Sequence, residues 1–146
     1  MDGEGRVMAL DIGDVRTGVA VSDPLRIIAS PHGVVQEPTP EATVAAIRAL
    51  VEELRPVVVV AGVPLDREGK PGPQAEKTLA MVARLREALD VPVETQDERF
   101  STAAANRSLL AANLRRKKRK QVVDKVAATH ILEAYLQRQA SGRGHE

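Results

Sequence analysis

The sequence predicts a single α/β domain in which an antiparallel strand hairpin is followed by strands joined through helices. Two apolar runs within residues 7–21 flank a turn segment with two glycines, which is typical of a hairpin. Residues 41–54 carry apolar side chains three and four positions apart, and the apolar, β-branched run 57–61 follows. A chain of 146 residues is long enough to bury a core without disulfides or a structural metal. We therefore expect one domain over residues 1–146.

The elements after the hairpin extend the predicted sheet. Short apolar pieces at 27–30 and 34–35, separated by Pro31 and Gly33, predict a third strand or strand pair at the sheet edge. The helix over 41–54 is expected to end before a proline. A strand, a helix and a strand in this order imply a parallel crossover. The unbroken run 57–61 is of the kind found in strands covered on both faces.

A Gly- and Pro-rich segment, GVPLDREGKPGP at 62–73, follows that strand. It carries Arg67 and Lys70, and we expect an exposed loop at the carboxyl end of the strand, where open α/β sheets place their ligands. The alternative is a plain connector.

Helices dominate the remaining chain. A second helix is expected to pack through Leu79, Val82, Leu85 and Leu89, and Arg86 falls at the margin of that face. The later elements are a short strand at 91–95, an alanine-rich helix at 103–114 and a final helix at 122–138, with disordered ends at 1–5 and 139–146.

Composition excludes several kinds of chemistry. The chain has no cysteine, which removes disulfides, thiolate metal sites and cysteine nucleophiles. No apolar run approaches membrane length and the first residues lack a signal-peptide pattern, so we expect a cytoplasmic protein that does not associate with membranes. The two aromatic residues, Phe100 and Tyr135, are too few for a base-stacking platform.

Positive charge is concentrated between the last two predicted helices, although the net charge is only +1. Like charges packed this closely repel one another, which favours a polyanion such as nucleic acid as partner. A merely solvated tract is the alternative. The run consists of Arg115, Arg116, Lys117, Lys118, Arg119 and Lys120.

Three separate elements each supply a carboxylate. Asp11 leaves the first strand, and Glu98 or its neighbour Asp97 leaves the last one. Asp124 lies in the final helix. Hard divalent cations bind a few such oxygen ligands and keep several waters, so the three carboxylates suit a metal site. Acidic residues are also ordinary at strand ends, and for Glu98 a surface salt bridge with Arg99 is the competing interpretation.

Asp124 has an unusual position on its helix. At about 100° per residue it falls in the same sector as Ala128, Ile131 and Tyr135, in the middle of the apolar face. A carboxylate aimed at a core is costly unless a positive group meets it. This favours a metal ligand, with a helix-start residue that interacts with the dipole or caps a backbone amide as the alternative.

Four motifs together resemble one family. DIGDVRTGVAVSDP, GVPLDREGKPGPQAE, DERFST and DKVAATHILEAYL follow one another, over residues 7–136, as in the YqgF (RuvX) family, which is similar to the Holliday junction resolvase RuvC. The resemblance implies an RNase H-like fold, with a mixed five-stranded sheet and helices on both faces. It also implies a nuclease site built on acidic residues and Mg²⁺ or Mn²⁺. The family's acidic positions match Asp11, Glu98 and Asp124.

Family members are described as nucleases that mature the 5′ end of pre-16S ribosomal RNA, and some as junction resolvases. The resemblance therefore implies structured RNA, branched DNA or ribosomal precursor particles as partners. Many members have Lys where this chain has Val15, beside the position of Arg16. This departure concerns a second basic contact at the hairpin turn and not the metal site.

The leading hypothesis is a metal-dependent phosphodiesterase in which Asp11 contacts both ions of a two-metal site. Its phosphate-binding residues would be Arg16, Arg67, Lys70, Arg99 and the basic run. Alternatives are a junction resolvase-like DNA endonuclease, a non-catalytic nucleic-acid-binding module, and an ATPase of the actin-like kind, which needs a second such domain. RNA and DNA remain open as substrates, and so do a monomer and a homodimer.

Overall fold

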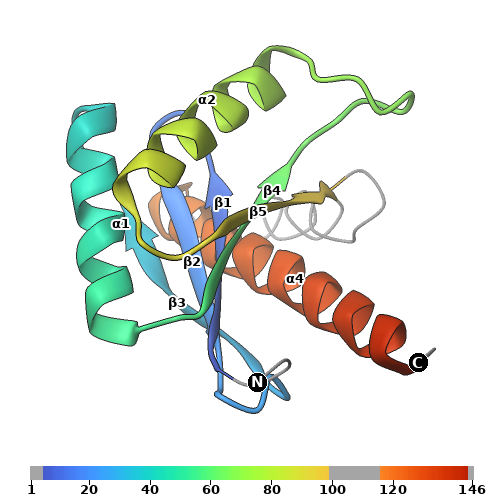
Figure 1. The fold of residues 1–146 in the computed structure, drawn as a ribbon. Coiled ribbons are helices and arrows are strands. Elements are labelled where there is room, and N and C mark those ends of the chain that lie inside the picture. Colours follow the sequence, from blue (N-terminus) through green and yellow to red (C-terminus); the bar gives the residue numbers. More distant parts are fainter. Residues whose placement is uncertain (1–4, 99–115, 145–146) are drawn as a thin grey trace.

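The fold is a mixed five-stranded sheet between two layers of helix (Figure 1). The computed structural model describes residues 5–98 and 116–144, and within the last helix it describes side chains from 126 to 140. The predicted helix at 103–114 therefore lies outside the described residues. Within them, no helix is both long and apolar enough to cross a membrane.

The sheet has the order β3-β2-β1-β4-β5. Strands β1 (Val7–Ile12), β2 (Thr17–Ser22) and β3 (Ala29–Val35) are antiparallel neighbours, which confirms the hairpin and the edge strand. Strands β4 (Val58–Val63) and β5 (Val93–Asp97) continue the sheet parallel to β1. The carboxyl ends of β1, β4 and β5 therefore share one edge, called here the carboxyl edge.

Helix α1 (Pro40–Leu54) begins and ends as its sequence predicts. The Thr39 hydroxyl accepts a hydrogen bond from the backbone N–H of Ala42 at 3.1 Å, and Pro40 occupies the first turn, where no N–H partner is needed. At the other end Arg55 adopts a left-handed conformation and donates its N–H to the Val51 carbonyl. Pro56 then prevents the helix from continuing.

Helix α2 (Pro73–Ala88) packs through a stripe that differs from the predicted one. Leu79 is 38% exposed, so the prediction that it faces the core is wrong. Ala75 and Thr78 are buried instead, together with the correctly predicted Val82 and Leu85. Thr78 is tolerated there because its hydroxyl donates to the Gln74 carbonyl at 3.1 Å.

Helix α4 (Arg116–Gly144) is longer than predicted at both ends. The sequence predicted a helix over 122–138 that follows the basic run, whereas residues 116–120 of that run form its first turns. Lys and Arg are good helix formers, so a charged run does not stop a helix. The sequence also predicted disorder from residue 139, whereas α4 continues through residue 144.

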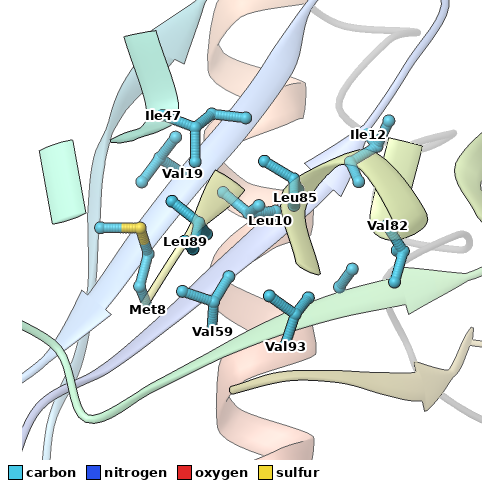
Figure 2. Packing of buried hydrophobic residues seen from close by; sticks show 11 residues of the cluster. Met8, Leu10, Ile12, Val19, Ile47, Val59, Val82, Leu85, Leu89 and Val93 are labelled. Carbon is cyan, nitrogen blue, oxygen red and sulfur yellow. The ribbon is translucent and has the colours of Figure 1, made fainter. Parts of the chain in front are cut away.

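Two hydrophobic cores lie on opposite faces of the sheet. Helices α1 and α2 cover one face and α4 covers the other (Figure 1). The core under α1 and α2 includes Met8, Leu10, Ile12, Val19, Ile47, Val59, Val82, Leu85, Leu89 and Val93 (Figure 2). The core under α4 comprises Val7, Ala9, Ala20, Val58, Val60, Ala128, Ile131, Leu132 and Tyr135. Because side chains alternate along a strand, odd-numbered residues of β1 and even-numbered residues of β4 face α4.

Candidate functional site

Asp11 lies on the α4 face of the sheet, near the carboxyl edge. Because side chains alternate along a strand, Asp11 points to the same face of the sheet as Val7 and Ala9. The residue is only 8% exposed. Its cross-strand partner on β2 is Gly18. On the other side, the parallel register pairs Leu10 with Ala61, so Gly62 is the next residue beside Asp11. Glycine on both neighbouring strands leaves room around this carboxylate.

Gly62 is the position that brings Glu98 close to Asp11. A Cβ atom built on Gly62 would lie 2.5 Å from Cδ1 of Ile131 and 2.9 and 3.0 Å from Cγ and Cδ of Glu98. Real Cβ atoms essentially never make contacts this short with carbon atoms, so the Glu98 carboxyl group occupies the space that a side chain at Gly62 would take. Glu98 is 5% exposed. It leaves the end of β5 and lies back over β4, one strand spacing of about 4.8 Å from the strand of Asp11.

Asp97, the alternative to Glu98, lies on the other side of the sheet. Val93 belongs to the core under α1 and α2, whereas the carboxylate of the next residue, Glu94, accepts a hydrogen bond from Tyr135 of α4. Alternation along β5 therefore directs Asp97 away from α4. Of the two acidic neighbours, Glu98 is the one on the face of Asp11.

The direction of α4 shows where Asp124 lies along the sheet. Tyr135 contacts Glu94 near the start of β5, whereas Ile131 contacts the space at Gly62 and Glu98, nearer the carboxyl ends of the strands. Lower residue numbers in α4 therefore lie closer to the carboxyl edge. Asp124 comes seven residues before Ile131, about 10 Å along the axis. Its side chain lies outside the described residues, and its role as a ligand stays a prediction.

The contact between Tyr135 and Glu94 joins α4 to the sheet through a polar interaction. The phenol donates to Oε2 of Glu94 at 2.6 Å. Burial, and after it this hydrogen bond to a carboxylate, raises the pKa of Tyr135 to about 12. The phenol is therefore neutral at physiological pH and acts as a donor that links α4 to β5.

Gln96 is a buried polar residue of the site that the sequence alone did not reveal. It is 6% exposed, and its side-chain oxygen Oε1 has no hydrogen-bond partner among the described residues. It pairs with Gly62 across β4 and β5, and alternation puts it on the α4 face with Glu98. No local sequence signal marks this position, because its burial depends on tertiary packing and not on neighbouring residues in the chain.

These residues fit a divalent cation by their chemistry. Two buried carboxylates lie on one face of the sheet, and an unpartnered amide oxygen stands beside them. Hard cations such as Mg²⁺ and Mn²⁺ prefer oxygen ligands of this kind. Among the side chains that the structure describes, no three His, Asp or Glu residues gather as a metal-binding group. The third predicted ligand, Asp124, is not among those side chains.

Three of the predicted phosphate-binding residues follow strands that end at the carboxyl edge. Arg16 ends the turn between β1 and β2, and its carbonyl accepts the N–H of Gly13 at 2.9 Å. Arg67 and Lys70 belong to the loop 64–72 that follows β4. Arg99 lies outside the described residues. So does Arg115, and the side chains of Arg116, Lys117, Lys118, Arg119 and Lys120 are not described either.

The loop that carries Arg67 and Lys70 has a defined backbone. Oδ1 of Asp66 accepts hydrogen bonds from the N–H groups of Glu68 and Lys70 at 2.9 and 2.8 Å. The Asp66 N–H donates to the Lys70 carbonyl at 3.0 Å, and Leu65 and Pro71 form an isolated bridge. The two basic residues are thus presented on a closed turn at the carboxyl edge, beyond the end of β4.

The family model of RuvX, described as Holliday junction resolvase, matches residues 5–138. A "Putative pre-16S rRNA nuclease" of Halothermothrix orenii is 44% identical over 131 residues, which cover 90% of this chain and 94% of the relative. A protein of the same name from Desulforudis audaxviator is 43% identical over 138 residues, which cover 94% of this chain and 98% of the relative.

Two solved structures share the fold at low identity. RuvC of Thermus thermophilus, in complex with a Holliday junction substrate, has a TM-score of 0.52 at 19% identity and covers 92% of this chain and 95% of its own. The Fowlpox virus resolvase, in complex with Holliday junction DNA, has a TM-score of 0.56 at 9% identity, covering 91% and 97%. Together with the family model and the relatives, these matches establish that the chain belongs to the RuvX family and has the RNase H-like fold of the resolvases.

Proposed function

We propose that the protein is a metal-dependent nuclease that hydrolyses phosphodiester bonds in the maturation of the 5′ end of pre-16S ribosomal RNA. The observation that carries this proposal is the position of the Glu98 carboxyl group, over Gly62 and next to the strand of Asp11. Two acidic side chains from distant parts of the chain are thereby buried on one face. The names of relatives that match this chain over nearly its whole length support the choice of substrate.

Asp11, Glu98 and Asp124 would hold Mg²⁺ or Mn²⁺. When bound, such an ion supplies Lewis-acid chemistry, because it lowers the pKa of water and stabilises charge on a leaving oxygen. The protein's own contribution is to bury the Asp11 and Glu98 carboxylates on one side of the sheet. Ile131 of α4 packs against the space above Gly62, next to the Glu98 carboxyl group.

The first turns of α4 support a nucleic-acid partner. Five consecutive cations, residues 116–120, lie in the part of α4 that runs towards the carboxyl edge. A phosphate backbone bound there would neutralise charges that otherwise repel one another. Arg16, Arg67, Lys70 and Arg99 would contact further phosphates along the same edge.

A second candidate substrate is a four-way DNA junction, which the description of the matching family model favours. It would use the same carboxylates and the same cations. It differs in needing two symmetric sites, and hence two copies of the chain.

The test is a cleavage assay in which an RNA with the 5′ leader of pre-16S rRNA and a four-way DNA junction are incubated with the purified protein. Each substrate is tested with Mg²⁺, Mn²⁺ and EDTA, and ATP turnover is measured as a control for another enzyme class. Asp11→Asn is compared with Asp14→Asn, because Asp14 is an exposed carboxylate in the adjacent turn that pairs with Lys77 at 3.3 Å. We expect metal-dependent RNA cleavage that only Asp11→Asn abolishes. Cleavage of the junction alone would reassign the substrate, and cleavage in EDTA would contradict the proposal.

A further inference from the structure

The side chain of Gln96 has a feature that the two carboxylates do not explain. Its Oε1 is the one buried side-chain nitrogen or oxygen atom without a hydrogen-bond partner in the part of the chain that the structure describes. Buried polar atoms are nearly always paired, because removing them from water without a partner costs free energy. An apolar side chain of similar length would fill the same space without that cost. The amide at this position therefore calls for a chemical reason.

Its position relative to the acidic residues is set by strand register. Glu94, Gln96 and Glu98 alternate onto the α4 face of β5, as the bond from Tyr135 to Glu94 and the contact of Glu98 with the space above Gly62 both indicate. Gln96 pairs with Gly62, and Gly62 follows Ala61 in register beside Asp11. Asp11, Gly62 and Gln96 thus form a row across β1, β4 and β5, and the Glu98 carboxyl group lies over the middle of this row.

The acidic neighbours of Oε1 in this row cannot satisfy it. Ionised carboxylates offer only acceptor oxygens, and an amide oxygen is an acceptor as well. What Oε1 needs is a donor. A hard divalent cation keeps several waters when it binds to a few carboxylates. Each of these waters binds the ion through its oxygen, so its O–H groups point away from the ion and act as strong donors.

We propose that Gln96 is a positioning residue of the metal site, whose Oε1 accepts a hydrogen bond from a hydration water of the cation held by Asp11 and Glu98. This inference rests on the proposed function, because it needs a cation at the two carboxylates. Groups that act on a metal through its bound ligands affect binding about 10-fold to 100-fold. Gln96 would thereby orient the hydration shell, while its own oxygen gains the partner that it lacks.

The test measures binding of Mn²⁺ to the protein without nucleic acid, by electron paramagnetic resonance of free Mn²⁺, together with the melting temperature in EDTA. Gln96→Met keeps the length of the side chain and removes the oxygen, and Gln96→Glu keeps an oxygen at the same place. Thr95→Val is the matched control, since Thr95 is on the same strand, exposed and on the opposite face.

We expect Gln96→Met to weaken Mn²⁺ binding about 10-fold or more, with an unchanged or higher melting temperature in EDTA. Gln96→Glu should retain binding and Thr95→Val should change neither quantity. Wild-type affinity in Gln96→Met would overturn the inference, and so would a lower melting temperature with intact binding. If Gln96→Met fails to fold, Gln96→Leu replaces it as the variant without the oxygen. Weaker Mn²⁺ binding by Gln96→Glu than by Gln96→Leu then overturns the inference.

Asp11→Asn separates this inference from the proposed function. If the wild type binds Mn²⁺ and Asp11→Asn does not, the metal site stands and the Gln96 variants decide the inference alone. If the wild type and Asp11→Asn bind Mn²⁺ equally, the cation is not held at Asp11 and the proposed site itself is contradicted.

Discussion

The phenol of Tyr135 on α4 donates a 2.6 Å hydrogen bond to the carboxylate of Glu94 on β5. This contact joins the helix that carries Asp124 to the strand that ends beside Glu98. Because a helix is a rigid element, this bond and the packing of α4 on β1, β2 and β3 together determine how far the earlier turns of α4 reach over the carboxyl edge. The geometry of the predicted acidic site therefore depends in part on contacts well outside it.

Tyr135 is predicted to ionise only in strongly alkaline solution. Since Tyr135 is the single tyrosine of the chain, the ultraviolet absorbance of tyrosinate follows its titration directly. We expect a midpoint near the raised pKa of about 12, against 10.0 for a free tyrosine. Glu94→Gln should lower the pKa, but not fully to 10.0, because burial, the larger cause, remains. A midpoint near 10.0 in the folded wild type would show that the phenol is not held in this way.

The same pKa shift predicts a dependence of stability on pH. A phenol whose folded-state pKa is raised contributes its full stabilisation below the unfolded value of 10.0, and this contribution is lost as the pH rises through about 12. We expect the free energy of unfolding, measured with urea, to fall more steeply over this interval in the wild type than in Tyr135→Phe. Equal pH profiles would indicate that the pKa of Tyr135 is the same in the folded and the unfolded protein.

Gly62→Ala tests the close approach of Glu98 and Ile131 over β4. The added methyl group would lie 2.5 Å from Ile131 Cδ1 and must displace it together with Glu98. We expect a loss of about 1–3 kcal/mol in the free energy of unfolding, as for overpacked cores, and a large decrease in metal-dependent cleavage. Gly33→Ala is the control, because a Cβ on Gly33 meets nothing within 4 Å. An active Gly62→Ala variant would show that the position of Glu98 is not required.

The basic residues at the start of α4 are predicted to bind phosphates without reading sequence. Replacement of Lys117, Lys118 and Lys120 by Gln should weaken binding to different nucleic acids about equally. It should also flatten the log-log dependence of affinity on salt by about 0.7–0.9 for each phosphate that the protein no longer neutralises. Arg48→Gln, an exposed cation on α1 that pairs with Glu52 at 3.5 Å, should leave the slope unchanged. An unchanged slope in the triple variant would mean that the run is only solvated.

The sequence predicted the local elements well, because their signals are local. The hairpin and α1 follow from turn residues, periodicity and caps within a few positions of each other. The predicted packing face of α2 was wrong at Leu79. Ala75 is small and the Thr78 hydroxyl is hydrogen-bonded within its own helix, so both residues suit close contact with the sheet better than a large residue.

The parts of the site that escaped prediction depend on register between strands. The position of Glu98 over β4 depends on Gly62, a residue far away in sequence that only the pairing of β4 with β5 brings beside it. The family resemblance pointed to Glu98, but the pattern of residues alone left Asp97 open, because the choice depends on which face of β5 meets α4. The sequence supplies the chemistry of these residues, and the register decides which of them share a face.

Asp11, Glu98 and Asp124 are proposed to bind metal as one unit. The most direct test is the rate of metal-dependent cleavage by Asp11→Asn, Glu98→Gln and Asp124→Asn, measured beside the double variant Asp11→Asn/Glu98→Gln. Ligands of one ion act together, so each single change should abolish most of the activity and the double variant should lose little more. Losses that simply multiply in the double variant, or near wild-type cleavage by any of the three single variants, would contradict a shared metal site.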